Sequence, residues 1–416
     1  MTKQISNSKQ NVIIFFLIAV FLCLPIDLLQ NADNVSGMSI SLILVAPSLL
    51  FYLIVNHNHK KYLTLAFCFS ILSVIVTQFL SGKFESRHFF SVIYFFAPVL
   101  TFYLGKKVVS NSFDLHRIYR IMCIVSVVFV WVLFISIILK HNGMVRTDSY
   151  FNGDFFGLVL SGSYGIHSLG AHLFILMFVL HFYLVLEKVS TPAKVIIIIS
   201  ILQVIYMIVL SLSRELVLAL LFYYAVFYWK KLGVIRTFLA VILIAIIGKV
   251  FFLQYFDAVL DAWATKLDVT KSSSNLNELS SGRIDLQELA IQQLFFNPFF
   301  GTGFQGYILN FKSYKGYDNL DGWSTHIYYL TALWKMGIFA FAFYFIYWLK
   351  IIKGLFRIKN PMILNDDATL LIKIFILSIL FVNLFWDAFL APNVMALFAF
   401  FCGTLDFCIS RKKKII

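Results

Sequence analysis

Two arginines and a histidine, each next to an apolar stretch or a predicted helix, are the residues of this sequence best suited to chemistry on an anionic substrate. Arg214 stands beside Glu215 where an apolar stretch begins, in SLSRELVLALLFYY, and Arg283 follows Ser-Ser-Gly at the start of a predicted helix. The free backbone N–H groups of a helix start attract anions, and a guanidinium can bind two phosphate oxygens at once. We therefore expect Arg214 and Arg283 to bind a phosphate-type group. The alternatives are an interfacial ion pair at Arg214 and a solvated loop arginine at Arg283.

His326 is the candidate general base. It opens an apolar stretch in the segment GWSTHIYYLTALWKMGIFAF. An imidazole ordinarily titrates near neutrality, which suits the removal of a proton from a hydroxyl group. The alternative is a histidine that only donates a structural hydrogen bond or only binds the phosphate. Glu215, Asp154 and Asp321 are the reserve candidates for the base.

A further polar group lies in the segment RTDSYFNGDFFG, which covers residues 146–157. Arg146 and Asp154 stand there among tyrosine and phenylalanine side chains. Aromatic faces pack on the C–H surfaces of sugars, and carboxylates accept hydrogen bonds from sugar hydroxyls. We therefore expect Arg146 and Asp154 to contact a carbohydrate, with an ordinary amphipathic loop as the alternative.

The composition excludes most soluble classes of protein. The 416 residues are 61% hydrophobic and only 13% charged, whereas about a quarter of a soluble domain is charged. The net charge of +14 comes from short Lys and Arg clusters between apolar stretches, a pattern typical of membrane orientation signals rather than of nucleic-acid binding. The five cysteines lie in apolar stretches without paired metal-ligand spacing. We therefore expect membrane lipid around the protein, no metal site and no nucleic-acid partner.

The elements that must position these residues are predicted to be membrane-spanning helices, each of about 20 mostly apolar residues. This pattern predicts an all-α polytopic membrane protein with about 12 transmembrane helices. The twelve stretches cover residues 12–29, 38–55, 62–80, 88–104, 118–139, 167–186, 193–212, 215–229, 234–256, 326–349, 368–390 and 392–410.

The basic residues orient these spans with both termini in the cytoplasm. In that arrangement 21 of the 34 Lys and Arg residues are cytoplasmic and ten are outside, as the positive-inside rule requires. Two long connections then lie outside, at residues 140–166 and 257–325. They divide the chain into nine spans (1–256), a large outer loop (257–325), and three spans with a basic cytoplasmic tail (326–416).

One helix is predicted inside the large outer loop. Residues 283–296 repeat apolar side chains with helical spacing, and Asn297-Pro298 follows as a helix end. Such an amphipathic helix lies on a membrane surface or covers a cavity. The sequence Gly301-Thr302-Gly303 then predicts a tight turn.

The order of motifs in this region resembles the membrane polymerases and ligases of bacterial surface polysaccharides. Those proteins usually carry Gly-Arg, a helix, Pro-x-x-Gly-x-Gly, a variable loop, and a histidine followed by aromatic residues and Gly-Ile. The corresponding residues here are Gly282, Arg283, Pro298, Gly301, Gly303, His326, Tyr328, Tyr329, Gly337 and Ile338. The Ser213-Arg214 pair at an outer membrane boundary resembles the same group.

Within this superfamily the chain is more similar to the O-antigen polymerase (Wzy) family than to the O-antigen ligase. Arg146 and Gly157 have the Arg-x10-Gly spacing that polymerases can carry in outer loops. Ile327 stands where many ligases place an asparagine. Arg283 departs from the polymerase spacing, because Leu294 stands eleven residues after it.

The resemblance implies a GT-C-like fold in the bacterial inner membrane, with a periplasmic active site and with neither cofactor nor metal. It implies a glycosyltransferase that moves a growing glycan from undecaprenyl diphosphate to a sugar hydroxyl of the next lipid-linked oligosaccharide unit, as in lipopolysaccharide biosynthesis. A chain-length regulator protein is an expected partner. The implied catalytic residues are His326, Arg283 and Arg214, and the implied substrate-binding residues are Arg146, Glu215, Asp154, Asp321 and Tyr328.

Three other functions remain as alternatives. The O-antigen ligase transfers a finished glycan to lipid A-core, and the sequence does not separate it cleanly from the polymerase. A lipid-linked oligosaccharide flippase is less favoured, since it needs no large structured outer loop. A structural membrane subunit has no need of three outer arginines near a histidine.

Overall fold

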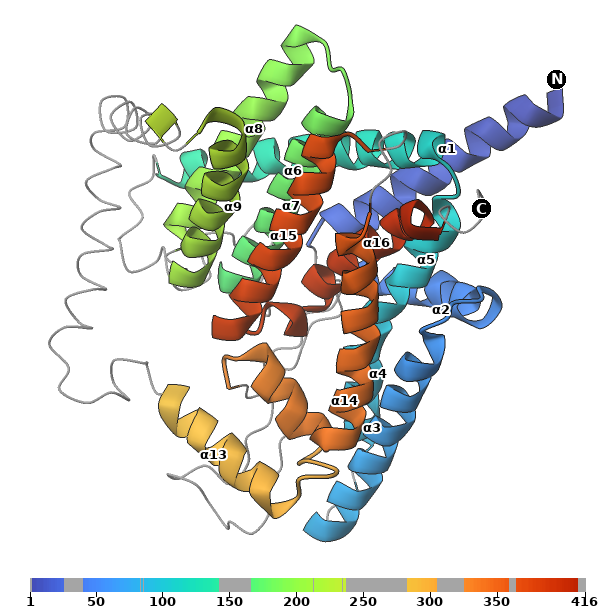
Figure 1. The fold of residues 1–416 in the computed structure, drawn as a ribbon, viewed down its shortest axis with the longest axis vertical. Helices are drawn as coiled ribbons and strands as arrows, with labels where there is room; N and C mark the ends of the chain where they lie inside the picture. Colours follow the sequence, from blue (N-terminus) through green and yellow to red (C-terminus); the bar gives the residue numbers. More distant parts are fainter. Residues whose placement is uncertain are drawn as a thin grey trace, which may run out of the picture.

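The chain folds as a bundle of helices (Figure 1). The computed structural model describes residues 2–25, 40–82, 84, 86–141, 166–211, 213–233, 235–236, 283–304, 325–358 and 364–410. Every regular element within these ranges is a helix. They are α1 (Thr2–Cys23), η1 (Ile40–Leu44), α2 (Val45–Ile54), α3 (Lys60–Ser81), α4 (Arg87–Phe96), η2 (Ala97–Leu100), α5 (Thr101–Val108), α6 (Ser112–His141), α7 (Ile166–Leu186), α8 (Thr191–Leu210), α9 (Arg214–Leu232), α13 (Arg283–Phe296), α14 (Tyr328–Phe356), α15 (Asp366–Phe385), η5 (Ala388–Leu390) and α16 (Pro392–Ser410).

Eight helical stretches in the described part of the chain are long and apolar enough to cross a membrane. They coincide with eight of the twelve predicted spans and confirm an all-α polytopic membrane protein. The predicted spans at 12–29 and 38–55 correspond to shorter apolar helices. The one at 215–229 corresponds to α9. The one at 234–256 lies almost wholly outside the described residues, as do most of the two predicted outer loops, 140–166 and 257–325.

The most deeply buried of these helices, α16, packs against α5 near the middle of the bundle (Figure 1). Two glycines allow this close contact. A Cβ atom at Gly403 would lie 2.0 Å from the carbonyl oxygen of Phe102, and one at Gly105 would lie 2.4 Å from that of Phe400. Small residues at helix crossings let two backbones approach each other inside a membrane.

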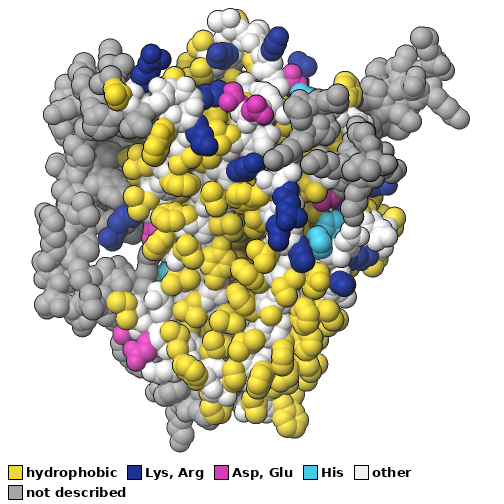
Figure 2. All heavy atoms as spheres, in the orientation of Figure 1, with side chains coloured by type: hydrophobic (Ala, Val, Ile, Leu, Met, Phe, Trp, Pro, Cys, Tyr) yellow, Lys and Arg dark blue, Asp and Glu magenta, His cyan; other side chains and the backbone are white. Residues whose placement is uncertain are grey.

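The upper and lower parts of the face shown in Figure 2 carry different kinds of side chain. Lys and Arg side chains gather over the upper part of the face in Figure 2, whereas hydrophobic side chains cover most of its lower part. Large apolar side chains are also exposed along α3, α8 and α14. An apolar surface of this breadth suits helices that face lipid rather than water.

The helix α14 is broken at Gly337, where φ is 74° and ψ is 172°. Its first half, residues 328–336, runs obliquely, and its second half continues alongside α3 (Figure 1). A helix break inside a membrane protein leaves backbone N–H and C=O groups that need new partners.

The turn after α13 supplies those partners. The N–H groups of Thr302 and Gly303 donate to the carbonyl oxygens of Trp334 and Lys335 at 3.0 and 3.1 Å. In return, the N–H of Ile338 donates to the carbonyl oxygen of Pro298 at 2.9 Å. Residues 298–303, which we call the interlock turn, therefore pair with the break through backbone atoms.

The helix predicted inside the outer loop is confirmed as α13, with the bounds Arg283–Phe296. Its Leu289 and Ala290 are buried against Trp334 of α14. The predicted turn is also confirmed, with φ values of 66° at Gly301 and 76° at Gly303. These contacts place α13 directly on the first half of α14.

Candidate functional site

The backbone at His326 has an unusual conformation. Its φ of 56° makes it the one non-glycine residue with a positive φ in the described part of the chain. Such a left-handed conformation strains an ordinary residue, and it is often found at functional sites. His326 comes two residues before α14 begins and is partly exposed.

Two buried threonines bond to each other next to this histidine. The Thr325 N–H donates to Oγ1 of Thr331 at 3.0 Å, and the two hydroxyl oxygens lie 2.8 Å apart. The Thr325 hydroxyl also accepts from the N–H of Ile327 at 3.3 Å and lies 3.0 Å from the Ile327 carbonyl oxygen. The residues on both sides of His326 are thereby tied to the first turn of α14.

The helix α13 reaches the same segment. Nε2 of Gln287 donates to the carbonyl oxygen of Thr325 at 3.4 Å. Gln287 stands one helical turn after Arg283, the first residue of α13. The side chain of Arg283 lies outside the described part of the structure, so its predicted approach to Arg214 stays a prediction.

Arg214 is the first residue of α9, as predicted, and it is partly buried. Ser213 precedes the helix in an extended conformation, and its hydroxyl donates to Oε2 of Glu215 at 3.0 Å. Arg214, Leu218 and Phe222 follow one another at intervals of four residues and therefore share one face of α9. Leu218 and Phe222 line the cavity described next.

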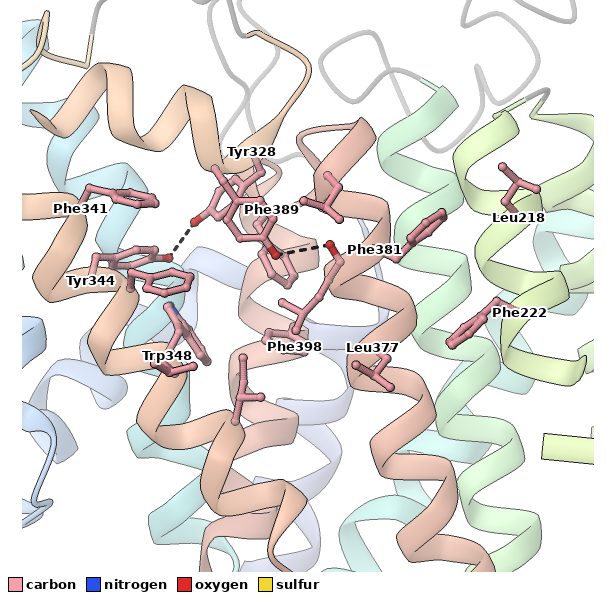
Figure 3. Close-up of a pocket in the computed structure, with 16 residues that line it drawn as sticks. Leu218, Phe222, Tyr328, Phe341, Tyr344, Trp348, Leu377, Phe381, Phe389 and Phe398 are labelled. Carbon is pink, nitrogen blue, oxygen red and sulfur yellow. Dashed lines mark hydrogen bonds between the residues drawn. The ribbon is translucent and has the colours of Figure 1, made fainter. Parts of the chain in front are cut away.

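A cavity of about 850 Å³ lies between α9, α14 and α15, with η5 and α16 behind it (Figure 3). We call it the aromatic groove. Its deep wall consists of buried aromatic residues: Tyr328, Tyr344, Trp348, Phe389 and Phe398. Its rim is exposed, with 53% of Leu218 and 49% of Leu384 accessible. The groove therefore opens sideways, through apolar side chains.

Few polar groups line the groove. The hydroxyls of Tyr328 and Tyr344 form a hydrogen bond of 2.8 Å between the two halves of α14. The Tyr329 hydroxyl donates to the carbonyl oxygen of Leu380 at 3.4 Å. Both interactions are drawn in Figure 3. A long apolar chain fits such walls better than a free sugar does.

Two of the predicted site residues lie on helices that line the groove. Tyr328 forms part of the groove wall, two residues after His326, and Arg214 begins the α9 face that lines the opposite side. Arg146, Asp154 and Asp321 lie outside the described residues. Among the described residues, no group of three or more His, Cys, Asp or Glu side chains could hold a metal ion.

Several residues near the site were not identified from the sequence. Thr325 and Thr331 carry no motif beyond their place beside His326, and the groove depends on contacts between distant helices. Asp387, which stands inside the predicted span 368–390, is the third such residue. The structure places it, buried, before η5, whose Phe389 packs edge-on against Tyr328 with ring centroids 5.4 Å apart.

Comparison with known families gives a match over the region of this site. Residues 198–345 match a family model described as O-antigen ligase. The matched region includes Arg214, Glu215, Arg283, His326 and Tyr328. It confirms the resemblance to the O-antigen polymerase and ligase superfamily, whose members transfer glycans in bacterial membranes. No curated protein matches the chain.

Proposed function

We propose that this protein polymerises undecaprenyl-diphosphate-linked oligosaccharide units on the periplasmic face of the bacterial inner membrane. In this reaction the growing glycan passes from its lipid diphosphate to a sugar hydroxyl of the next lipid-linked unit. The aromatic groove is the observation that carries the proposal. It is an apolar cavity large enough for part of a lipid chain, and its walls include Tyr328, two residues after His326, and the helix that Arg214 begins.

The lipid chain of the donor would occupy the groove. A polyprenyl chain is apolar, and burying it against aromatic walls is favoured by the hydrophobic effect. The exposed rim at Leu218 and Leu384 lets such a chain enter from the bilayer without crossing water. The diphosphate would then lie where the groove ends, near the start of α9.

Arg214 and Arg283 would bind that diphosphate. As the glycosidic bond breaks, negative charge grows on the departing phosphate oxygen, and a nearby guanidinium stabilises this charge. Losing one such contact costs about 2–4 kcal/mol, or about 30- to 1000-fold in rate. Substitution by lysine keeps the charge but loses the two-pronged geometry, so it should also lower the rate.

His326 would act as the general base. The acceptor hydroxyl attacks the anomeric carbon, the bond from that carbon to the diphosphate oxygen breaks, and the hydroxyl proton passes to the imidazole. The diphosphate leaves with the bonding electron pair. Glu215, Asp154 and Asp321 are the alternative bases, and Arg146, with these carboxylates, would contact the sugars.

The ligase is the second candidate, because the matching family model carries that description. We favour the polymerase on the Arg146–Gly157 spacing and on Ile327 after the histidine. Deletion of the gene followed by gel analysis of lipopolysaccharide separates the two. A polymerase deletion leaves core with a single repeat unit, whereas a ligase deletion leaves bare core.

Site variants test the assigned roles in purified protein with a lipid-linked donor. Arg214→Ala and Arg283→Ala should lower turnover by the factor given above, whereas Arg236→Ala, an exposed arginine beyond the far end of α9, should not. His326→Gln should abolish turnover and leave donor binding nearly intact. If His326→Gln weakens binding and rate in step, His326 is a diphosphate ligand instead. Normal turnover by Arg283→Ala would refute the role of that arginine in binding the diphosphate.

A further inference from the structure

The left-handed backbone at His326 needs a cause, because the histidine has a Cβ atom that disfavours it. The glycines with positive φ elsewhere in the described chain adopt such values without this penalty. A strained residue persists only where its surroundings fix it. We therefore attribute this conformation to the contacts of the neighbouring residues.

The Thr325 hydroxyl joins the two residues that flank His326. It accepts a hydrogen bond from the Ile327 N–H at 3.3 Å and lies 3.0 Å from the Ile327 carbonyl oxygen. These contacts close a short hydrogen-bonded ring that includes the backbone of His326. A backbone held at both neighbours in this way has few φ and ψ combinations left.

Thr331 fixes that ring to the helix. Its hydroxyl oxygen accepts from the Thr325 N–H at 3.0 Å and lies 2.8 Å from the Thr325 hydroxyl oxygen. Both threonine side chains are fully buried, with 0% exposure. Water cannot replace these bonds, so losing the Thr331 hydroxyl leaves a buried N–H without an acceptor.

We propose that Thr325 and Thr331 are positioning residues that hold His326 in its left-handed conformation and so aim its imidazole at the reacting hydroxyl. The catalytic part of this inference rests on the proposed function, whereas the conformational part does not. Gln287 extends the arrangement to α13 through the Thr325 carbonyl oxygen. The backbones that carry His326 and Arg283 are thereby linked.

The conformation can be tested without any activity assay. At a left-handed position glycine is relieved of the Cβ penalty and alanine is not, so His326→Gly should melt about 1–2 °C above His326→Ala. In a Thr331→Val background the ring is no longer fixed to the helix, and that difference should vanish or reverse. Equal melting temperatures of the two variants in the otherwise unchanged protein would overturn the proposal.

Turnover then tests the catalytic part. Thr331→Val should lower kcat about 10- to 100-fold with little change in KM, because the base is displaced while the donor still binds. Thr331→Ser keeps the hydroxyl and should restore most of the rate. The matched control is Thr404→Val. Thr404 is a fully buried residue of α16, and its hydroxyl forms a 3.0 Å hydrogen bond with the hydroxyl of Tyr119 in α6. It should lower the melting temperature and leave kcat unchanged.

The outcomes separate the two proposals. Normal kcat in Thr331→Val, while His326→Gln is inactive, refutes the positioning role and leaves the proposed function standing. Normal kcat in His326→Gln refutes the base assignment, and the melting comparison then still decides whether the threonines hold the backbone. A loss of rate in Thr331→Val that Thr331→Ser does not restore also counts against a role for the hydroxyl.

Discussion

Replacing Gly337 with alanine tests whether the interlock turn and the broken helix depend on each other. Gly337 has a φ of 74° and a ψ of 172°, a conformation that essentially only glycine adopts and that costs an alanine about 1–3 kcal/mol. The added Cβ would also lie 2.3 Å from the carbonyl oxygen of Phe299 and 2.5 Å from the carbonyl carbon of Phe300. Backbone atoms cannot rotate away as side-chain ends can, so the turn must move.

Moving the turn breaks hydrogen bonds that water cannot replace. Thr302, Gly303 and Ile338 each donate a backbone N–H across this contact, and a buried donor left without a partner costs about 1–3 kcal/mol. With the strain included, we expect Gly337→Ala to lower the free energy of unfolding by about 2–6 kcal/mol. Thermal unfolding of the protein in detergent or nanodiscs measures this.

Gly82 provides a control that has a positive φ but no steric clash. Its φ is 67°, and a Cβ there would meet nothing within 4 Å. Gly82→Ala should therefore cost only about 1–2 kcal/mol. If the two substitutions destabilise the protein equally, residues 298–303 do not fill the break in α14, and the reasoning is wrong.

Three further predictions concern other parts of the molecule. Burial, helped by repulsion from His57 and Lys350 and opposed by Asp406, lowers the pKa of His59 below its usual 6.5. The unfolded chain then binds this proton more readily, so stability falls as the pH drops below about 6.5. His59→Asn should narrow the difference in melting temperature between pH 7 and pH 5, and an unchanged difference contradicts this. Gly403→Ala should separate α5 from α16 and lower the melting temperature by more than Gly82→Ala does, since its Cβ would lie 2.0 Å from a carbonyl oxygen. Tyr344→Phe removes a 2.8 Å hydrogen bond across the groove wall and should lower the unfolding free energy by about 1 kcal/mol; an equal loss in the Tyr328→Phe/Tyr344→Phe double variant would confirm that the two hydroxyls act as a pair.

The helices were predictable where local signals mark their ends. The bounds of α13 follow from a helix-start pattern before Arg283 and from Asn297-Pro298 after it, and the structure agrees at both ends. The span at 88–104 was likewise predicted as one unit, and α4, η2 and α5 together form it. Such stretches can be placed from local sequence alone, because their length and hydrophobicity do not depend on contacts with distant residues.

The break in α14 was not predictable, since its cause lies elsewhere in the chain. Residues on both sides of Gly337 are apolar and read as one span, and a glycine inside a helix does not by itself break it. Its conformation depends on the interlock turn, more than thirty residues earlier in the sequence. The aromatic groove and the contacts of Thr331 depend on tertiary contacts in the same way, so residue type alone could only suggest His326 and Arg214.

The anchoring of both flanks of residues 305–324 has a consequence for how far this segment can vary in length. The chain before this segment is bound to α14 through Gly303 and Lys335, and the chain after it through Thr325 and Thr331. The segment itself lies outside the described residues, and both of its anchors lie on the same half of one helix. Closing a loop between two fixed points costs little more when the loop is longer. Replacing these residues with a segment of another length would therefore cost little stability and leave the backbone contacts of α14 in place.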